Sequence, residues 1–321
     1  MTELTPISFV ENDLDAIATH VGRVAVFVDG EGKMDLAARR VNRLTKGAVA
    51  RLLESERWGE MSDGDVVSMA YPAGMAADAV DVVRLERNAK GMPARKAGAS
   101  LAKARGGKAD MLVLCSTLRK AEDVIYGLAM RDYAFEDHKS AESTRSGAVQ
   151  VMSGKPDELE AACKPLLAVA EGAHMCRDLT NEPANILTTT NYAERLKEME
   201  ALGLNVEVQD EEALTKLGMR TLLSVGQGSV SPSYVVVMRW DGGKKGDAPL
   251  ALVGKGVVFD TGGISLKPGA GMGDMTMDMG GSAVVAGVMR TLALRGAKAN
   301  VVGLVGIVEN MPSGNASRPG D

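Results

Sequence analysis

Short runs of β-branched residues alternate with helical patterns along this chain of 321 residues, and the alternation limits the folds open to it. Residues 23–28, 65–70 and 110–115 are strand-like, and residues 36–53 and 118–130 follow a helical period. Strands separated by helices form layered structures around a mostly parallel sheet. We therefore predict an α/β fold for the first part of the chain.

A long helical pattern divides this alternation from a second one. It opens at Pro156, after the strand-like residues 149–152, continues to about residue 176, and is broken at 181–185. We predict a smaller N-terminal α/β domain over 1–152, a connecting helix over 153–180, and over 181–321 the first part of a larger α/β domain with a mixed sheet. The second alternation comprises helices at 192–202, 211–217 and 281–295 and strands at 205–208, 234–240, 250–253 and 300–308.

The charge of the chain argues against nucleic acid as its main partner. A net charge of -5 and a sequence pI near 5.5 leave no global basic field for a phosphate backbone, although a local basic stripe is compatible with them. We interpret the basic stretch 87–108, which has room for a helix, as a solvent-facing segment rather than a binding patch.

Cysteine usage and the N-terminus indicate a cytoplasmic protein. Cys115, Cys163 and Cys176 are odd in number and widely spaced, which is typical of reduced, structural thiols. The first residues lack the basic start and apolar stretch of a secretory signal, and no run approaches the ~20 apolar residues of a membrane span. We expect a soluble protein with no membrane contact.

Lys255 and Asp260 lie just after the predicted strand 250–253, where α/β sheets gather ligands. Glycines flank both residues and allow tight backbone conformations. Asp278 stands near the start of the predicted helix 281–295, where a carboxylate alone would also serve as helix-start chemistry. Together the two carboxylates and one neutral amine could ligate a divalent ion, so we predict a metal site.

Lys267 would add a second positive group close to the same carboxylates. If it remains charged, it could hydrogen-bond a carbonyl oxygen and stabilise the oxyanion of a tetrahedral intermediate. The alternative is an ordinary loop lysine before Pro268.

Several segments together resemble the leucyl aminopeptidases, the cytosolic two-metal peptidases. Residues 178–185 are similar to the entry into that family's catalytic domain. The longest match, at 253–268, reads Val-Gly-Lys-Gly-Val-Val-Phe-Asp-Thr-Gly-Gly-Ile-Ser-Leu-Lys-Pro. Further matches are Met275, 278–281, 308–314 and 318–321. Thr261 replaces the family's common serine.

The resemblance implies a role for each candidate residue. Lys255, Asp260 and Asp278 would be metal ligands, with Asp260 bridging two ions. Lys267 would be the catalytic lysine that polarises the scissile carbonyl, and Met275 would line the pocket for the N-terminal side chain. The substrate-binding residues would be Lys255, Asp260, Lys267 and Met275. The expected cofactors are two divalent metal ions, zinc or manganese first, with cobalt or magnesium compatible.

The same resemblance implies a metal-dependent aminopeptidase that releases N-terminal amino acids, with a leucine-like preference, from peptides with a free N-terminus. Family members are typically homohexamers, so the resemblance implies a homo-oligomer. The family's next motif, Asn-Thr-Asp-Ala-Glu-Gly-Arg, would add an aspartate, a glutamate and an arginine to the site. Residue 321 precedes it, and we expect the natural protein to extend further.

Other reaction classes fit the sequence less well. His20, His138 and His174 are scattered and form no His-Glu-x-x-His pair, which excludes a zincin. No Gly-x-Ser-x-Gly elbow is present, and the glycines near 226–228 and 269–273 complete no nucleotide-binding motif. The rival from another class is a catalytically incompetent, aminopeptidase-like binding or assembly subunit.

Overall fold

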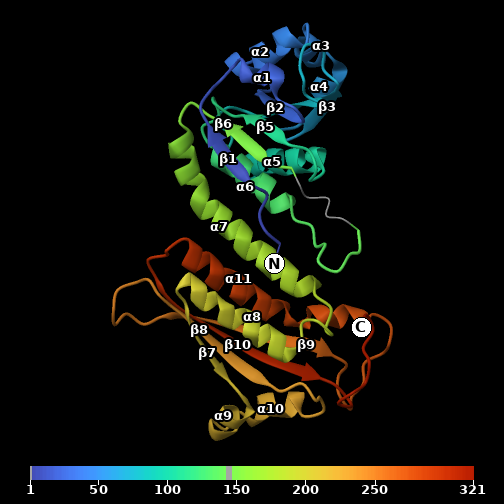
Figure 1. Cartoon of the computed structure of the whole chain (residues 1–321), viewed down its shortest axis with the longest axis vertical. Coiled ribbons are helices and arrows are strands. Elements are labelled where there is room, and N and C mark those ends of the chain that lie inside the picture. The colour runs from blue at the N-terminus through green and yellow to red at the C-terminus, as the bar shows by residue number, and fades with distance from the viewer. Residues whose placement is uncertain (1, 142–146) are drawn as a thin grey trace. The chain divides into compact units, whose positions relative to one another are not determined.

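The computed structural model of the protein describes residues 2–141 and 147–321. These residues form two compact units, which are described separately. The first comprises Glu3–Ala170, and the second comprises Glu171–Asp321 together with Thr2. The chain is mixed α/β throughout, as predicted (Figure 1).

The first unit is built on a six-stranded sheet with the order β1-β6-β5-β2-β4-β3. All neighbouring strands pair in parallel except β3 and β4, which are antiparallel. Its elements are β1 (Ile7–Val10), α1 (Ala16–Thr19), β2 (Arg23–Val28), α2 (Leu36–Leu44), α3 (Ala48–Leu53), α4 (Glu56–Glu60), β3 (Val66–Ala70), β4 (Ala79–Arg84), α5 (Met92–Arg105), β5 (Met111–Leu114), α6 (Ala121–Arg131), β6 (Val149–Met152) and the first part of α7 (Pro156–Asn181).

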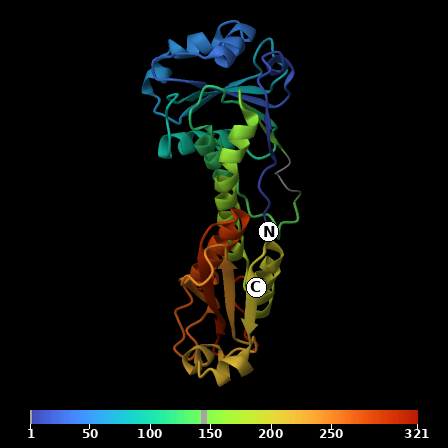
Figure 2. The same ribbon diagram turned by 90° about the vertical axis from the view of Figure 1, so that its left-hand side faces the viewer.

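Alternate residues of the strands supply two cores, one on each face of this sheet. Ala25 and Phe27 of β2 pack with α5, α6 and α7. Val24, Val26 and Val28 pack with α1 to α4 on the opposite face. A strand buried on both faces reads as a continuous apolar run, which is why β2 and β5 were predictable from the sequence. Figures 1 and 2 show the two helical layers on either side of the sheet.

Two predictions for this unit were wrong. The single helix expected over 36–53 is two helices, because Lys46 and Gly47 take positive φ angles of 51° and 81° between α2 and α3. The segment expected to face solvent at 87–108 contains α5, and its alanine face is buried. A Cβ at Gly98 would lie 1.8 Å from the carbonyl oxygen of Val124, so α5 packs closely on α6 through small residues that carry little hydropathy.

The second unit is built on a four-stranded mixed sheet with the order β7-β8-β10-β9. Strand β10 pairs antiparallel with β8 and parallel with β9, which is an edge strand among the described residues. The elements after α7 are α8 (Thr189–Lys197), the 3₁₀ helix η1 (Glu198–Leu202), β7 (Asn205–Gln209), α9 (Glu211–Lys216), α10 (Arg220–Gly226), β8 (Tyr234–Asp241), β9 (Leu250–Asp260), the 3₁₀ helix η2 (Met272–Met279), α11 (Gly280–Leu294) and β10 (Asn300–Asn310).

Helices cover both faces of this sheet. Helices α8 and α11, with the end of α7, bury the larger core around Val236, Val305 and Ile307. The short helices α9 and α10 cover the other face around Val235 and Val302. In Figure 1, α9 and α10 lie across the sheet from α8 and α11. The mixed α/β sheet predicted for this part of the chain is confirmed.

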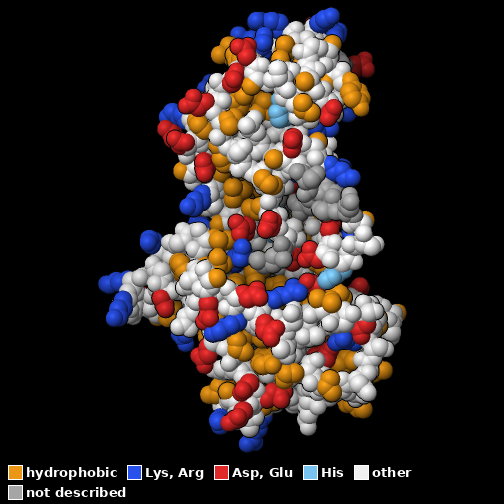
Figure 3. Space-filling view, viewed as in Figure 1, with side chains coloured by type: hydrophobic (Ala, Val, Ile, Leu, Met, Phe, Trp, Pro, Cys, Tyr) orange, Lys and Arg blue, Asp and Glu red, His pale blue; other side chains and the backbone are white. Residues whose placement is uncertain are grey.

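The three cysteines are free thiols, and the surface carries charges of both signs (Figure 3). Cys115, Cys163 and Cys176 are free thiols, and burial raises the pKa of both Cys115 and Cys163 to about 12. A thiolate is therefore disfavoured at both positions. Acidic and basic side chains intermingle on the face shown in Figure 3. No helix among the described residues is long and apolar enough to cross a membrane.

Candidate metal centre

Strand β9 carries the first two candidate ligands. It runs from Leu250 to Asp260, seven residues further than the predicted strand, so Lys255 and Asp260 lie within the strand rather than beyond it. Gly254 and Gly256 explain the underestimate, because glycine weakens a strand pattern. Here they allow close packing: a Cβ at Gly254 would lie 2.6 Å from the Cα of Ser282 on α11.

An irregularity in β9 places Lys255 and Asp260 on the same side of the sheet. Five positions separate them, and an odd separation in a regular strand puts two side chains on opposite faces. Lys255 pairs with Gly306, whereas Asp260 pairs with Asn310, four residues further along β10. The register shift near the end of β9 therefore inserts one extra residue in β9, and such a bulge re-aims the side chain that follows it.

Asp260 is held by three donors. Lys267 Nζ lies 2.6 Å from Oδ2, while Asn310 Nδ2 and the Gly262 amide donate to Oδ1 at 2.7 Å and 2.9 Å. Partial burial would raise the pKa of Asp260, but these hydrogen bonds and the charge of Lys267 outweigh it and lower the pKa. The carboxylate is thus kept ionised, as a metal ligand requires.

A glycine turn returns Lys267 to Asp260. Gly262 and Gly263 have φ angles of 90° and 64°, which favour glycine. The Lys267 amide then donates to the carbonyl of Thr261 at 2.8 Å. A Cβ at Gly262 would lie 2.4 Å from the carbonyl oxygen of Ser265, so no other residue fits the turn as it stands.

Lys255 and Asp278 form the second charged pair. Lys255 Nζ lies 2.7 Å from both carboxylate oxygens of Asp278, which is near the end of η2. The lysine side chain is 59% exposed and that of Asp278 23%. Backbone packing brings the two together, since a Cβ at Gly281 would lie 3.3 Å from the Lys255 nitrogen.

Met275 joins the first pair rather than the second. Its sulfur lies 3.2 Å from Lys267 Nζ, which also contacts Asp260. The structure thus brings together Asp260, Lys267 and Met275, and separately Lys255 and Asp278. Among the interactions of the described residues, no hydrogen bond or ion pair links the two groups directly.

The residues at this site fit part of a metal-ligand set. Asp278 and Asp260 each form an ion pair with a lysine ammonium, which shows that a positive charge fits beside each carboxylate. Carboxylate oxygens and amine nitrogens are also ligands that divalent metal ions accept. However, the described residues contain no group of three or more His, Cys, Asp or Glu side chains able to hold a metal ion. Two carboxylates balance only half the charge of two divalent ions.

Two features of the site were missed by residue-level reasoning. Asn310 contacts Asp260 because parallel pairing of β9 and β10 sets the two residues opposite each other. Glu309, on the same strand end, is buried and pairs with Arg318, while Ser229 also donates to it. The sequence signal that could have predicted these contacts is the polar pair Glu309-Asn310 at the end of the apolar strand β10.

Comparison with known proteins shows which family the chain resembles. The model of the catalytic domain of the cytosol aminopeptidase family matches residues 174–321. A probable cytosol aminopeptidase of Cereibacter sphaeroides is 56% identical over 321 residues, and one of Dinoroseobacter shibae is 58% identical over the same length. Each alignment covers 100% of this chain, which spans 65% of the length of these curated relatives.

Solved structures are similar over nearly the whole chain. The bottromycin maturation enzyme BotP in complex with Mn matches with a TM-score of 0.69 and 28% identity, over 94% of this chain and 62% of that one. A mutant of tomato leucine aminopeptidase matches with a TM-score of 0.77 and 22% identity, over 99% of this chain and 65% of that one. Residues 174–321 match the catalytic domain of the cytosol aminopeptidase family, and the resemblance found in the sequence is confirmed.

Proposed function

We propose that the protein acts as a metal-dependent aminopeptidase, which hydrolyses the first peptide bond of peptides that have a free N-terminus. The observation that carries the proposal is the pair of carboxylate-lysine contacts at β9, in a chain that resembles the cytosol aminopeptidase family. The BotP relative whose structure contains Mn supports a divalent ion here.

Lys255, Asp260 and Asp278 are the residues that would hold metal. Lysine ligates only as a neutral amine, so Lys255 would release its proton and leave Asp278 free to bind a cation. When bound, two divalent ions would activate a water for hydrolysis and stabilise the charge that develops on the peptide carbonyl. Zinc or manganese are the ions we expect, and cobalt or magnesium would suit the same donors.

Lys267 would be the catalytic residue supplied by the described chain. Its ammonium is anchored by Asp260 and has further hydrogen atoms to donate. Directed at the carbonyl oxygen of the scissile bond, it would stabilise the negative charge of the transition state without having to move. Because its side chain is 35% exposed, a substrate can reach it.

Met275 would contact the N-terminal side chain of the substrate. Its sulfur lies beside Lys267, and it packs with the small apolar cluster that contains Phe259 and Met311. A flexible apolar side chain at that place favours a leucine-like residue over a charged one. We therefore expect leucyl peptides to be cleaved faster than aspartyl peptides.

The test is hydrolysis of L-leucine p-nitroanilide and of leucyl dipeptides with Mn²⁺ or Zn²⁺ added. Asp260→Asn and Lys267→Met should each lower kcat about 100-fold or more, since both remove charge used in the transition state. Asp274→Asn is the matched control for Asp278→Asn, because Asp274 is exposed on the same 3₁₀ helix. Equal activity of Asp274→Asn and Asp278→Asn would contradict the assignment.

A second candidate is a non-catalytic, aminopeptidase-like binding or assembly subunit. The deficit of carboxylates among the described residues favours it, because two negative charges would face four positive ones. It predicts little metal uptake and no hydrolysis by the folded, metal-treated protein. The intact mass of the protein from its natural source, compared with 33.7 kDa, shows whether further ligands accompany this chain.

We further propose a cytoplasmic homo-oligomer, a hexamer by family resemblance. The relatives are named cytosol aminopeptidases, which supports the compartment. Light scattering coupled to size-exclusion chromatography gives the number of subunits directly. A monomer at working concentration would contradict the hexamer but not the chemistry.

A further inference from the structure

The last residue of strand β10 contacts the carboxylate of Asp260 directly. Asn310 Nδ2 donates to Asp260 Oδ1 at 2.7 Å, across 50 positions of the chain. The register of the parallel pair β9 and β10 sets the two residues opposite each other. The peptidase chemistry proposed above assigns no role to Asn310, although this side chain touches a proposed metal ligand.

Two further contacts fix the backbone of Asn310. Its carbonyl oxygen accepts from the Thr261 amide at 3.0 Å and from the Thr261 hydroxyl at 2.8 Å. Thr261 is only 5% exposed, so water has little access to this contact. The register between β9 and β10 is irregular between Val308 and Asn310. The two hydrogen bonds from Thr261 follow this irregularity, and they therefore hold Asn310 beside Asp260.

The side chain of Asn310 is held as well. A Cβ at Gly263 would lie 2.7 Å from Asn310 Oδ1, so this oxygen packs against the glycine. Gly263 has a positive φ of 64° and no side chain, which leaves room for the amide. An ionised carboxylate only accepts hydrogen bonds, so the amide must turn its nitrogen towards Asp260. Both ends of the Asn310 amide are thus placed.

The two oxygens of Asp260 are used differently. Oδ1 accepts from Asn310 Nδ2 and from the Gly262 amide at 2.9 Å, whereas Oδ2 accepts from Lys267 Nζ at 2.6 Å. A carboxylate offers about four lone-pair sites, two on each oxygen. Two donors therefore occupy Oδ1, and the contacts of the described residues leave Oδ2 with room for a cation.

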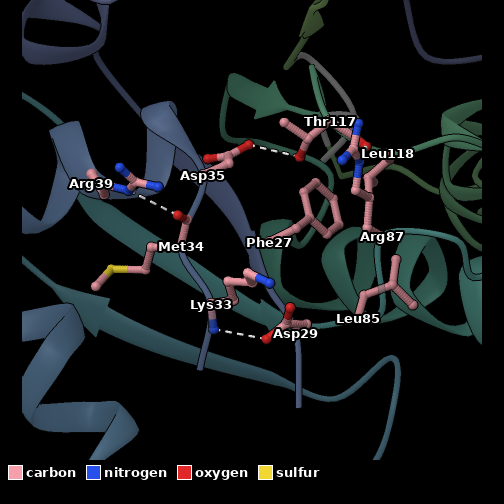
Figure 4. Close-up of a pocket in the computed structure, with 10 residues that line it drawn as sticks. All are labelled: Phe27, Asp29, Lys33, Met34, Asp35, Arg39, Leu85, Arg87, Thr117 and Leu118. Carbon is pink, nitrogen blue, oxygen red and sulfur yellow. Dashed lines mark hydrogen bonds between the residues drawn. The ribbon is translucent and has the colours of Figure 1, made fainter. Parts of the chain in front are cut away.

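Carboxylates at strand ends of the first unit show the contrast. Asp29 and Asp35 line a cavity of about 200 Å³ there (Figure 4). Asp35 accepts from the Ala38 amide at 2.8 Å as the cap of α2, and Asp29 accepts from the Lys33 amide at 2.7 Å. These carboxylates stabilise a helix start and a turn. Asp260 instead faces a lysine ammonium of the candidate site, so the orientation of its carboxylate bears on the proposed chemistry.

We propose that Asn310, fixed by Thr261, is a positioning residue that orients the Asp260 carboxylate for a divalent cation. The inference rests on the proposed metal-dependent function and adds two residues to it. Groups that hydrogen-bond a ligating carboxylate hold it in the geometry that the ion needs, and their loss costs about 10–100-fold in metal affinity. Without the Asn310 amide, the Asp260 carboxylate would be free to rotate.

The first experiment is isothermal titration of the full chain with Mn²⁺. Asn310→Leu keeps the approximate volume of the side chain but removes its donor, and should raise the Kd for Mn²⁺ about 10–100-fold. Thr261→Val should raise the Kd more than Thr261→Ser, because serine keeps the hydroxyl that donates to Asn310. Asn300→Ala is the matched control and should leave the Kd unchanged. Asn300 lies at the opposite end of β10, where its Nδ2 donates to the carbonyl of Lys244 at 2.8 Å.

The second experiment separates this inference from the proposed function. Crystal structures of the metal-free protein and of metal-free Asn310→Leu show the Asp260 carboxylate without any ion. We expect it to turn in the variant, while the backbone contacts of Thr261 remain. A carboxylate that keeps its orientation, with Lys267 Nζ still 2.6 Å from Oδ2, would overturn the positioning role whether or not the chain binds Mn²⁺.

The titration can contradict the inference in two further ways. The Kd for Mn²⁺ could be the same in Asn310→Leu as in the unaltered protein, or Asn300→Ala could raise it equally. No uptake of Mn²⁺ by the unaltered chain would overturn the proposed function and the part of the inference that concerns a cation. The crystal structures then still decide whether Asn310 orients Asp260. Circular dichroism of each variant separates loss of binding from loss of fold.

Discussion

Charged pairs serve different purposes in the two units. In the first, the side chains of Arg105 and Asp132 are 0% and 5% exposed. In the second, the side chains of Lys255 and Asp278 are 59% and 23% exposed. An ion pair that water cannot reach, such as Arg105–Asp132, is part of the packing. In an exposed pair such as Lys255–Asp278, another cation could replace the lysine ammonium beside the carboxylate. The contrast separates charges that hold the fold from charges available for chemistry.

Hydrogen bonding sharpens this contrast. The Arg105 guanidinium donates to the carbonyls of Gly107, Ala109 and Gly147, as well as to Asp132 and Thr5. Lys255 has one described partner, Asp278. A buried charge is tolerated only when its hydrogen bonds are satisfied, so the first arrangement has no capacity left for a ligand.

The largest expected effect is the loss of Arg105. Arg105→Met should lower the free energy of unfolding by about 3–5 kcal/mol, because Asp132 would remain buried and charged without its main partner. Urea denaturation measures the change. Lys155→Met is the control, since the side chains of Lys155 and Glu158 are 72% and 71% exposed and such pairs contribute about 0–1 kcal/mol. Similar losses of unfolding free energy in Arg105→Met and Lys155→Met would contradict the distinction between buried and exposed ion pairs.

Metal addition should stabilise the second unit. At a free Mn²⁺ concentration about 100 times its Kd, a single site adds about 2.7 kcal/mol to the free energy of unfolding. The melting temperature should therefore rise with Mn²⁺ in the unaltered protein and in Asp274→Asn, and stay constant in Asp278→Asn. A rise that persists in Asp278→Asn would place the ion elsewhere.

Close helix contacts through glycine occur in both units and should be similarly sensitive. Gly98→Ala should lower the free energy of unfolding by about 1–3 kcal/mol, because the new Cβ would lie 1.8 Å from the Val124 carbonyl oxygen. Gly172→Ala should do the same, with a Cβ 2.3 Å from the Gly287 carbonyl oxygen. Gly59→Ala, with nothing within 4 Å, is the control in thermal denaturation and should be neutral or stabilising.

The site lysines should matter little for folding. Lys255→Met and Lys267→Met should each change the free energy of unfolding by less than about 1 kcal/mol, because partly exposed pairs contribute little. Chemical denaturation of the metal-free variants tests this. A loss as large as that of Arg105→Met would mean that the site pairs hold the fold too.

The smallest effect concerns His20 of the first unit. Burial lowers its pKa from 6.5, partly offset by the charge of Asp110. The unfolded chain therefore binds the proton more readily, and stability should fall as the pH decreases from about 6.5 through the lower folded pKa. His20→Gln should flatten that part of the curve of unfolding free energy between pH 7.5 and 5. An unchanged slope would assign the dependence to other groups.

Much of the fold followed from local patterns. The buried strands β2 and β5 and the helix α6 were predicted because apolar runs of the right length and period specify them. The edge strand β1 and the alanine-rich helix α5 were missed or misjudged, since short strands and small residues carry weak signals. The long helix was predicted, although α7 extends to Asn181.

The candidate site divides in the same way. Lys255, Asp260, Lys267 and Asp278 could be named from residue type and family pattern. Their pairing could not, because it depends on the register between β9 and β10 and on packing against η2. The hydrogen bond from Asn310 to Asp260 depends on the same register and could not be predicted from the sequence.

The sequence by itself determined the α/β class, the resemblance to the cytosol aminopeptidases and the residue types present at the candidate site, because these depend on residue types and on periods of a few residues. The tertiary structure decided which donors meet. One extra residue in β9 turns Asp260 to the side of Lys255, and parallel pairing sets Asn310 beside Asp260 across 50 positions of chain. Register depends on which strand face is buried against elements distant in the sequence, so the residues around each donor do not reveal it by themselves.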